Sequence, residues 1–331
     1  MDGYPIDPLL GQNSMALPTQ HQRPLTGQLQ FVLLLVLSLV LWRQPFMRLV
    51  HLSLENDQYS YVVLIFGVGI ALIVLEWRRL EPVLERRIVL GSGVCLLAAA
   101  GQWWLGRHSN GIREDVVLSF SILTLVASWL GAFLLCYGIR AFRTLAFPLL
   151  FLVLIVPMPG SLLDPIVHAL QEGSAYATYV LFRAAGIPVV RTGFVLSLPG
   201  LDIEIARQCS SIRSSLILFA TGLVMGHLFL RSAGRKVLLC MVTLPIAVAK
   251  NGLRIFTLAT LGIYVDPGFL KGRLHQYGRI PFFLLSLALV LLVLGWLRRS
   301  EKLSEDRRAL RDSSALPRKL SLHKLHVSKL N

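Results

Sequence analysis

Charged side chains are scarce in this sequence of 331 residues. They make up 15% of it, whereas hydrophobic residues make up 54%. Soluble domains carry roughly 25% charged residues, so this composition excludes an ordinary soluble protein. Several apolar runs approach the ~20 residues that a helix needs to cross a bilayer. The composition therefore predicts one polytopic, all-α membrane domain.

Cysteine is also scarce, with four in the whole chain. Neither a CxxC pair nor a Cys/His cluster is present, so the sequence predicts no metal site and implies no cofactor. Cys95, Cys136 and Cys240 lie inside apolar runs, where a thiol is most simply a small hydrophobic side chain. Only Cys209 has polar neighbours, which makes it the one candidate for thiol chemistry.

Acidic residues are few as well: 18 stand against 33 Lys and Arg, which gives a net charge of +15. Nucleic acid is not the expected partner, because residues 298–331 alone hold ten of the basic residues and four acidic ones. Basic residues that flank membrane spans are typical of the cytoplasmic side and contact anionic lipid. The charge therefore predicts contact with membrane lipid and a topology signal.

The apolar runs predict about eight transmembrane helices. They are Leu29–Trp42, Tyr61–Leu75, Ile88–Leu105, Val116–Tyr137, Leu145–Val156, Ser214–Leu230, Val237–Ile263 and Ile280–Leu297. With both termini inside, the inner segments hold twenty Lys and Arg and the outer segments eleven, as the positive-inside rule requires. We expect a flexible cytoplasmic N-terminus (1–28), a membrane domain (29–297) and a flexible basic cytoplasmic tail (298–331). The N-terminus lacks the pattern of a cleavable signal peptide, so the first span is expected to act as an anchor.

The outer segment between the fifth and sixth spans has structure of its own. Residues 162–185 mix apolar and polar side chains, which favours a helix in the membrane interface. If this helix crossed the membrane instead, everything after it would be inverted. Residues 189–205 carry β-branched side chains and turn signals at Thr192-Gly193 and Pro199-Gly200, which predict a short hairpin leading to Cys209.

Three residues from distant segments could meet at the outer face. Cys209 lies between Arg207 and Arg213, just before the helix expected from Ser214. Nearby positive charge and a helix N-terminus both favour the reactive thiolate. The simpler interpretation is a structural thiol. Arg254 lies within a span, where inserting an arginine into the membrane costs about 2.5–3.5 kcal/mol. It is therefore either a structural residue that bonds to backbone carbonyls or a hydrogen-bond donor to an oxyanion. Its neighbour Asn251 shares the same helical face and could orient it or donate as well.

His275 lies in the loop that precedes the last span. A loop histidine is usually just solvated. Beside a thiol, it could accept the thiol's proton and later protonate a leaving amine. Topology permits His275, Cys209 and Arg254 to converge.

The C-terminal two-thirds of the chain resembles the exosortase/archaeosortase family of membrane transpeptidases. The segments that carry the resemblance are Phe147–Leu150, Val156–Pro159, Leu170-Gln171, Gly186–Val189 with Gly193, Ala206–Ser214, Asn251–Ile255 and His275–Gly278. The family's proposed catalytic Cys, Arg and His map onto Cys209, Arg254 and His275, and Arg213 is a further site residue by resemblance. Two positions depart from the family pattern: Ser211 replaces a common Gly, and Tyr61 replaces a His.

The resemblance implies a cysteine transpeptidase of the bacterial cytoplasmic membrane, with its active site on the outer face. Its substrates would be secreted proteins with a C-terminal sorting signal of the PEP-CTERM type: a short motif such as Pro-Glu-Pro, an apolar span and a basic end. The acceptor could be linked to lipid or glycan. A carboxylate of the motif could pair with an outer arginine; the candidates are Arg183, Arg191, Arg207 and Arg213.

Two other functions are compatible with the sequence. The chain could be a non-catalytic membrane component of exopolysaccharide biosynthesis or export, in which Arg254 and the outer arginines serve an anionic polymer. An ion-coupled transporter is a weaker interpretation, because Arg254 is the one strong charge evident in the central spans and no acidic partner for it is apparent.

Overall fold

A computed structural model of the chain describes residues 25–56, 59–78, 80, 88–205, 212–266 and 279–327. Helices dominate this part of the chain. They are α1 (Leu25–Leu41), α2 (Arg43–Glu55), α3 (Tyr61–Trp77), α4 (Ile88–His108), α5 (Glu114–Thr144), α6 (Ala146–Phe151), η1 (Leu152–Ile155), α7 (Gly160–Ala184), α8 (Ile212–Phe229), α9 (Ala233–Tyr264) and α12 (Arg279–Val327). The expected all-α polytopic membrane fold is confirmed.

Five described helices are long and apolar enough to cross a membrane: α4, α5, α8, α9 and α12. Two bent pairs could each form one further span. One is α1 with α2, bent by 79°, and the other is α6 and η1 with α7, bent by 91°. The described helices thus give five to seven candidate spans; the expected eight includes α3, which has only 17 residues.

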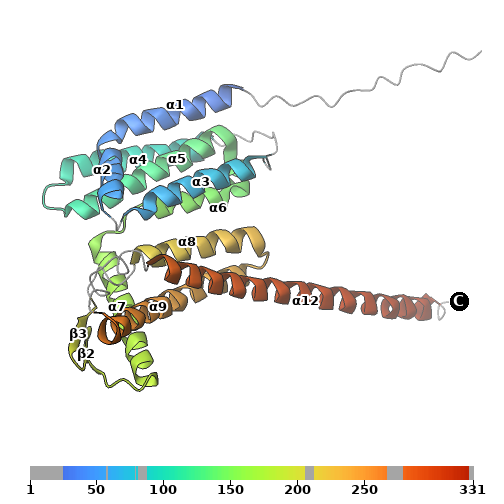
Figure 1. Cartoon of the computed structure of the whole chain (residues 1–331). Helices are drawn as coiled ribbons and strands as arrows, with labels where there is room; N and C mark the ends of the chain where they lie inside the picture. Colours follow the sequence, from blue (N-terminus) through green and yellow to red (C-terminus); the bar gives the residue numbers. More distant parts are fainter. Residues whose placement is uncertain are drawn as a thin grey trace, which may run out of the picture.

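Consecutive helices turn back at alternate ends of the bundle (Figure 1). We call the end that carries α2, the β-strands and the start of α8 the sheet end, and the end from which α12 projects the tail end. Both α2 and α7 run steeply across the direction of the other helices (Figure 1). Such a steep course is the one expected of an interfacial helix at residues 162–185. Helix α2 lies in the segment between the first two expected spans, for which no helix was predicted.

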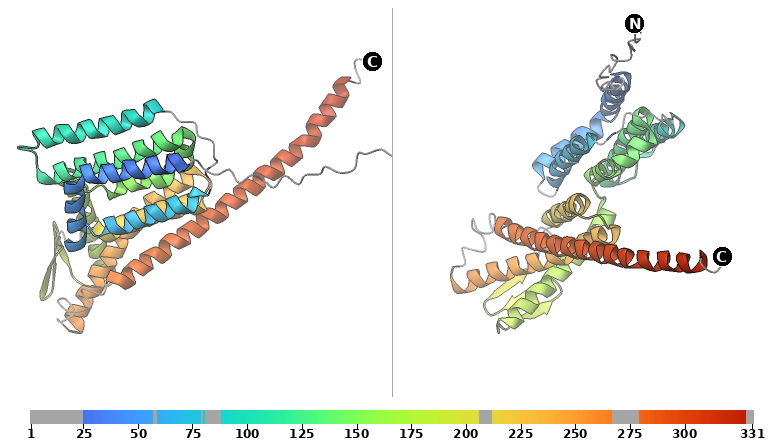
Figure 2. Two further views of the ribbon diagram at one scale, coloured as in Figure 1. Left: turned by 90° about the horizontal axis from the view of Figure 1, so that it is seen from above. Right: turned by 90° about the vertical axis from the view of Figure 1, so that its right-hand side faces the viewer.

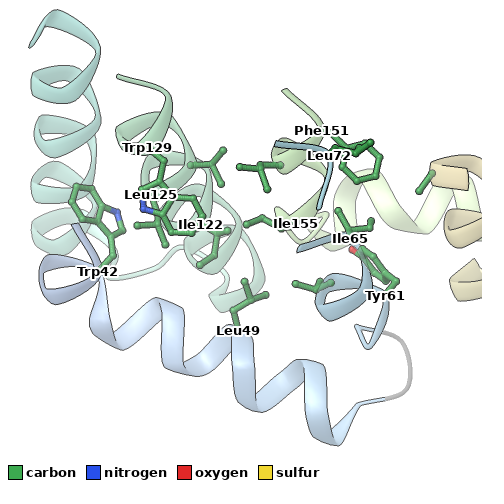
Figure 3. Close-up of a cluster of buried hydrophobic side chains, with 14 residues drawn as sticks. Trp42, Leu49, Tyr61, Ile65, Leu72, Ile122, Leu125, Trp129, Phe151 and Ile155 are labelled. Carbon is green, nitrogen blue, oxygen red and sulfur yellow. The ribbon is translucent and has the colours of Figure 1, made fainter. Parts of the chain in front are cut away.

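Trp42 lies at the bend between α1 and α2 and explains where the first span ends. Its buried indole N–H donates to the hydroxyl of Thr124 on α5 at 2.9 Å, and the indole of Trp129 donates to Ser38 on α1 at 2.9 Å. A buried indole needs such an acceptor. These two bonds hold α1 against α5, beside the hydrophobic cluster that joins α2, α3, α5 and η1 (Figure 3).

The segment before Cys209 forms a three-stranded antiparallel sheet. Its strands are β1 (Val190–Thr192), β2 (Val195–Leu198) and β3 (Leu201–Glu204), in the order β1-β2-β3. Gly193 (φ 61°) and Gly200 (φ 84°) occupy the two predicted turns in the left-handed conformation that glycine tolerates. The predicted hairpin is thus present, with one strand more than expected.

The sheet packs against α7 and the last third of α9, so these elements share a hydrophobic core at the sheet end (Figure 2). Phe182, Leu196 and Ile205 are almost fully buried in it. This core packs the end of β3 and the last third of α9 against α7.

At the tail end, α12 is fixed to the loop between α8 and α9. The buried carboxylate of Glu301 accepts hydrogen bonds from the backbone N–H groups of Arg231 (3.1 Å) and Ser232 (2.7 Å), and it pairs with Arg235 at 3.3 Å. The helix continues to Val327. The segment beyond Arg298 is therefore helical here, where a flexible tail was expected.

Candidate functional site

The structure describes half of the residues predicted for the site. Arg213 lies in the first turn of α8, and Asn251 and Arg254 lie on α9. Arg207 and Cys209 fall in residues 206–211, and His275 falls in residues 267–278; both segments lie outside the described residues. Convergence of the predicted catalytic residues therefore stays a prediction.

Helix α9 presents three buried polar side chains in little more than one turn. Lys250 is 6% exposed, Asn251 1% and Arg254 7%. The amide nitrogen of Asn251 donates to the hydroxyl of Ser174 on α7 at 2.9 Å. Asn251 was considered as a partner that orients Arg254; in the structure its amide binds α7 and so fixes the helix that carries Arg254.

Small residues let α7 and α9 approach each other closely. A Cβ placed on Gly252 would lie 2.6 Å from the Cβ of Ala177, which is too close for any side chain. The hydroxyl of Thr178 donates to the carbonyl of Ser174 at 2.7 Å and also lies 3.3 Å from the carbonyl of Gly252. A Cβ on Gly173 would lie 3.0 Å from the side chain of Val248. Such small-residue contacts are typical of tightly packed membrane helices.

Two side chains attach the ends of the segment that contains Cys209. The buried amide of Gln171 on α7 donates to the carbonyl of Ile205 at 2.9 Å, four residues before Cys209 in the sequence. The amine of Lys250 on α9 donates to the hydroxyl of Ser214 at 2.5 Å, five residues after it. Ile205 is thus bonded to α7, and Ser214 is bonded to α9, the helix that carries Arg254.

Neither anchor was predicted. Gln171 was noted as part of the Leu170-Gln171 segment of the resemblance and as a polar residue of an interfacial helix, without a role of its own. A glutamine on the apolar side of such a helix signals a specific hydrogen bond. Lys250 directly precedes Asn251, and its place inside a span was the signal that could have identified it.

The bend before α7 is held by Asp115 from the start of α5. Its carboxylate accepts a hydrogen bond from the backbone N–H of Gly160 at 2.7 Å and pairs with Arg113 at 3.0 Å. A carboxylate at the first N–H of a helix stabilises that end. Burial raises the pKa of Tyr59, and the negative charge of the same carboxylate adds to this shift. Asp115 therefore sets the direction in which α7 leaves the bundle.

The structure also corrects the expectation of a single strong charge in the central spans. Besides Lys250, Glu76 on α3 is 4% exposed, and its carboxylate lies 2.6 Å from the imidazole of His227 on α8. The His227 ring stacks on Phe147 with centroids 3.8 Å apart. His227 lies in the last turn of α8, at the tail end, whereas Ser214 lies in the first turn. This pair is therefore separate from the candidate site.

The described residues contain no group of three or more His, Cys, Asp or Glu side chains that could hold a metal ion. What this part of the structure does contain is buried basic and amide side chains on α7 and α9, beside the start of α8. These groups can donate hydrogen bonds to an oxyanion or a carboxylate.

Comparison with known proteins identifies the family. The profile of the transmembrane exosortases (Exosortase_EpsH) matches residues 52–294, which is most of the chain and includes every element of the candidate site. No curated protein and no solved structure matches the chain. The chain belongs to the transmembrane exosortase family.

Proposed function

We propose that this protein is a membrane cysteine transpeptidase that cleaves the C-terminal sorting signal of secreted proteins. The observation that supports it best is the pair of hydrogen bonds at Ile205 and Ser214, two described residues that flank Cys209 in the sequence. Gln171 binds the first of these residues and Lys250 binds the second, and Lys250 lies one turn from Arg254. The bond from Lys250 holds the start of α8 against α9, the helix that carries Arg254, and the bond from Gln171 holds the end of β3 against α7.

In the proposed reaction, the thiolate of Cys209 attacks the scissile carbonyl carbon of the sorting signal. Arg254 donates hydrogen bonds to the oxyanion of the tetrahedral intermediate. The intermediate collapses, the C–N bond breaks and His275 protonates the departing amine. A thioester on Cys209 remains, and an acceptor amine, or water, then attacks it and releases the thiol. The acceptor proposed here is linked to lipid or glycan.

The length of α8 supports a site at a membrane boundary. Its 18 residues span about 27 Å, close to the ~30 Å of a hydrocarbon core. The first turn of α8, with Arg213 and Ser214, would then lie at one surface of the membrane. The last third of α9 continues past this level and packs against the sheet. A substrate anchored by its own span would present its motif at that level, so the membrane supplies much of the positioning.

The basic residues favour an orientation with both termini in the cytoplasm. The tail end carries Arg231 and Arg235 and the start of the basic tail. With that end inside, the sheet end faces outward. We accordingly propose the inner membrane of a bacterium as the location, with the active site on its outer face, where exported proteins arrive.

The test is the processing of a co-expressed reporter that ends in a Pro-Glu-Pro-type sorting signal. We expect cleavage by the wild type and by Cys95→Ala, and none by Cys209→Ala. Cys95→Ala is the matched control because it removes a thiol whose side chain packs against Gly131, away from the candidate site. Mass analysis of the new C-terminus distinguishes transfer from hydrolysis. Equal cleavage by Cys209→Ala would exclude Cys209 as the nucleophile, whereas no cleavage by either the wild type or this variant would favour the non-catalytic role in exopolysaccharide export.

A further inference from the structure

Lys250 is a buried lysine near the middle of α9 that the proposed reaction does not use. It is 6% exposed, and its amine donates to the hydroxyl of Ser214. Among the described residues, no carboxylate forms an ion pair with it. A lysine inside a membrane protein is costly and normally marks a functional position. A single neutral hydroxyl is a poor partner for such a group.

The surroundings of Lys250 are all suited to an anion. Arg254 follows one helical turn later on the same face of α9. Ser214 lies in the first turn of α8, where the helix dipole and the backbone N–H groups favour negative charge. Two buried basic side chains and a helix N-terminus thus occur together. They can share an anionic group that approaches from the side of Ser214, which is partly exposed.

We propose that Lys250 binds a carboxylate of the substrate, namely the acidic side chain of the sorting motif. This inference rests on the proposed function, and it assigns specificity to a residue that the sequence did not single out. Lys250 lies level with the first turn of α8, which is the level at which a membrane-anchored signal places the residues next to its span. A charge-assisted bond there is strong because the site is shielded from water.

The outer arginines are less suited to this role. Arg191 already donates to the carbonyl of Gly193 at 3.0 Å and lies 3.9 Å from the carboxylate of Glu172. Arg183 is exposed, so its pairing with a carboxylate would be weakened by solvent. Arg213 is partly buried and is the remaining rival in the described part of the chain.

The experiment compares two reporters that differ only in the motif, Pro-Glu-Pro and Pro-Gln-Pro, in membranes that contain the full-length protein. We expect the wild type to process the glutamate reporter about 10- to 100-fold faster, as the loss of one charge-assisted bond implies. Lys250→Met and Lys250→Gln should process both reporters slowly and at equal rates. Lys250→Arg should keep the preference for glutamate. Lys236→Met, on the same helix at the tail end, is the matched control and should behave as the wild type.

Each other outcome is informative. Equal rates for the two reporters with the wild type, or a preference that survives in both neutral Lys250 variants, would overturn the assignment. Loss of the preference in Arg213→Met alone would transfer the role to that arginine. If Lys250→Met slowed transfer to the acceptor but kept the glutamate preference, the bound anion would be an acceptor phosphate and the carboxylate proposal would be wrong. If the wild type processed neither reporter, the proposed function itself would fail.

Discussion

The contact between Gly252 and Ala177 makes a sharp prediction, because one methyl group tests the geometry that holds Arg254. In an ordinary helix, Gly→Ala is favourable by about 1 kcal/mol. In Gly252→Ala the new Cβ would lie 2.6 Å from the Cβ of Ala177 and 3.2 Å from the backbone nitrogen of Thr178. Carbon atoms normally stay about 3.5–4.0 Å apart, so α7 and α9 must separate by about 1 Å.

This separation has two consequences that can be estimated. Overpacking a tight contact destabilises by about 1–3 kcal/mol. The hydrogen bond from Asn251 to Ser174 lengthens, and it contributes about 0.5–1.5 kcal/mol. We expect a net destabilisation of about 2 kcal/mol, which lowers the unfolding temperature by several degrees. The rate of reporter processing should fall by more than the loss of folded protein explains, because Arg254 moves with α9.

The measurement is thermal unfolding of the purified protein in detergent, together with reporter processing in membranes. Gly295→Ala on α12 is the matched control, since nothing lies within 4 Å of its added Cβ. It should unfold at the wild-type temperature or slightly above it. If Gly252→Ala matched Gly295→Ala in both assays, the close α7–α9 contact would not support the site.

Three further predictions address other contacts. Gln171→Leu removes the donor to the carbonyl of Ile205. It should lower reporter processing at least tenfold while changing the free energy of unfolding by only about 1–3 kcal/mol. Unfolding temperature and reporter rate, measured on the same preparation, separate the two effects. Asp115→Asn should destabilise by about 1 kcal/mol and increase protease cleavage near the start of α7, and unchanged digestion would count against its capping role. Glu76→Gln and His227→Ala should each destabilise the protein by about 1–3 kcal/mol. A double-mutant cycle should show that the two losses are not additive. Full additivity would mean that the two side chains do not interact.

The sequence was informative where hydrophobic length and turn chemistry decide the structure. The apolar runs located most helices, and the two glycine turns located the strands before Cys209. It failed where tertiary contacts decide. Helix α2 forms because Trp42 ends α1 against Thr124, and no local pattern shows that hydrogen bond. Likewise, the apolar run at residues 61–75 was expected to be a span, whereas α3 has 17 residues and is shorter than the five helices that could each cross a membrane.

The candidate site shows the same limit. Arg254 and Asn251 could be identified from their polarity inside an apolar run, and both are buried as such residues must be. Gln171 and Lys250 were missed because their roles depend on partners 34 and 36 residues away in the sequence. A polar residue inside a membrane helix indicates that a partner exists, but only the packing of α7, α8 and α9 shows which partner it is.

The most direct test of the central claim is detection of the acyl-enzyme. Membranes that contain the protein and a Pro-Glu-Pro-type reporter would be quenched during processing, and peptides that carry Cys209 would be analysed by mass spectrometry with and without hydroxylamine. The account predicts a reporter fragment on Cys209 that hydroxylamine releases, as expected of a thioester. Continued processing with no adduct on Cys209, or with an adduct on a different side chain, would contradict it.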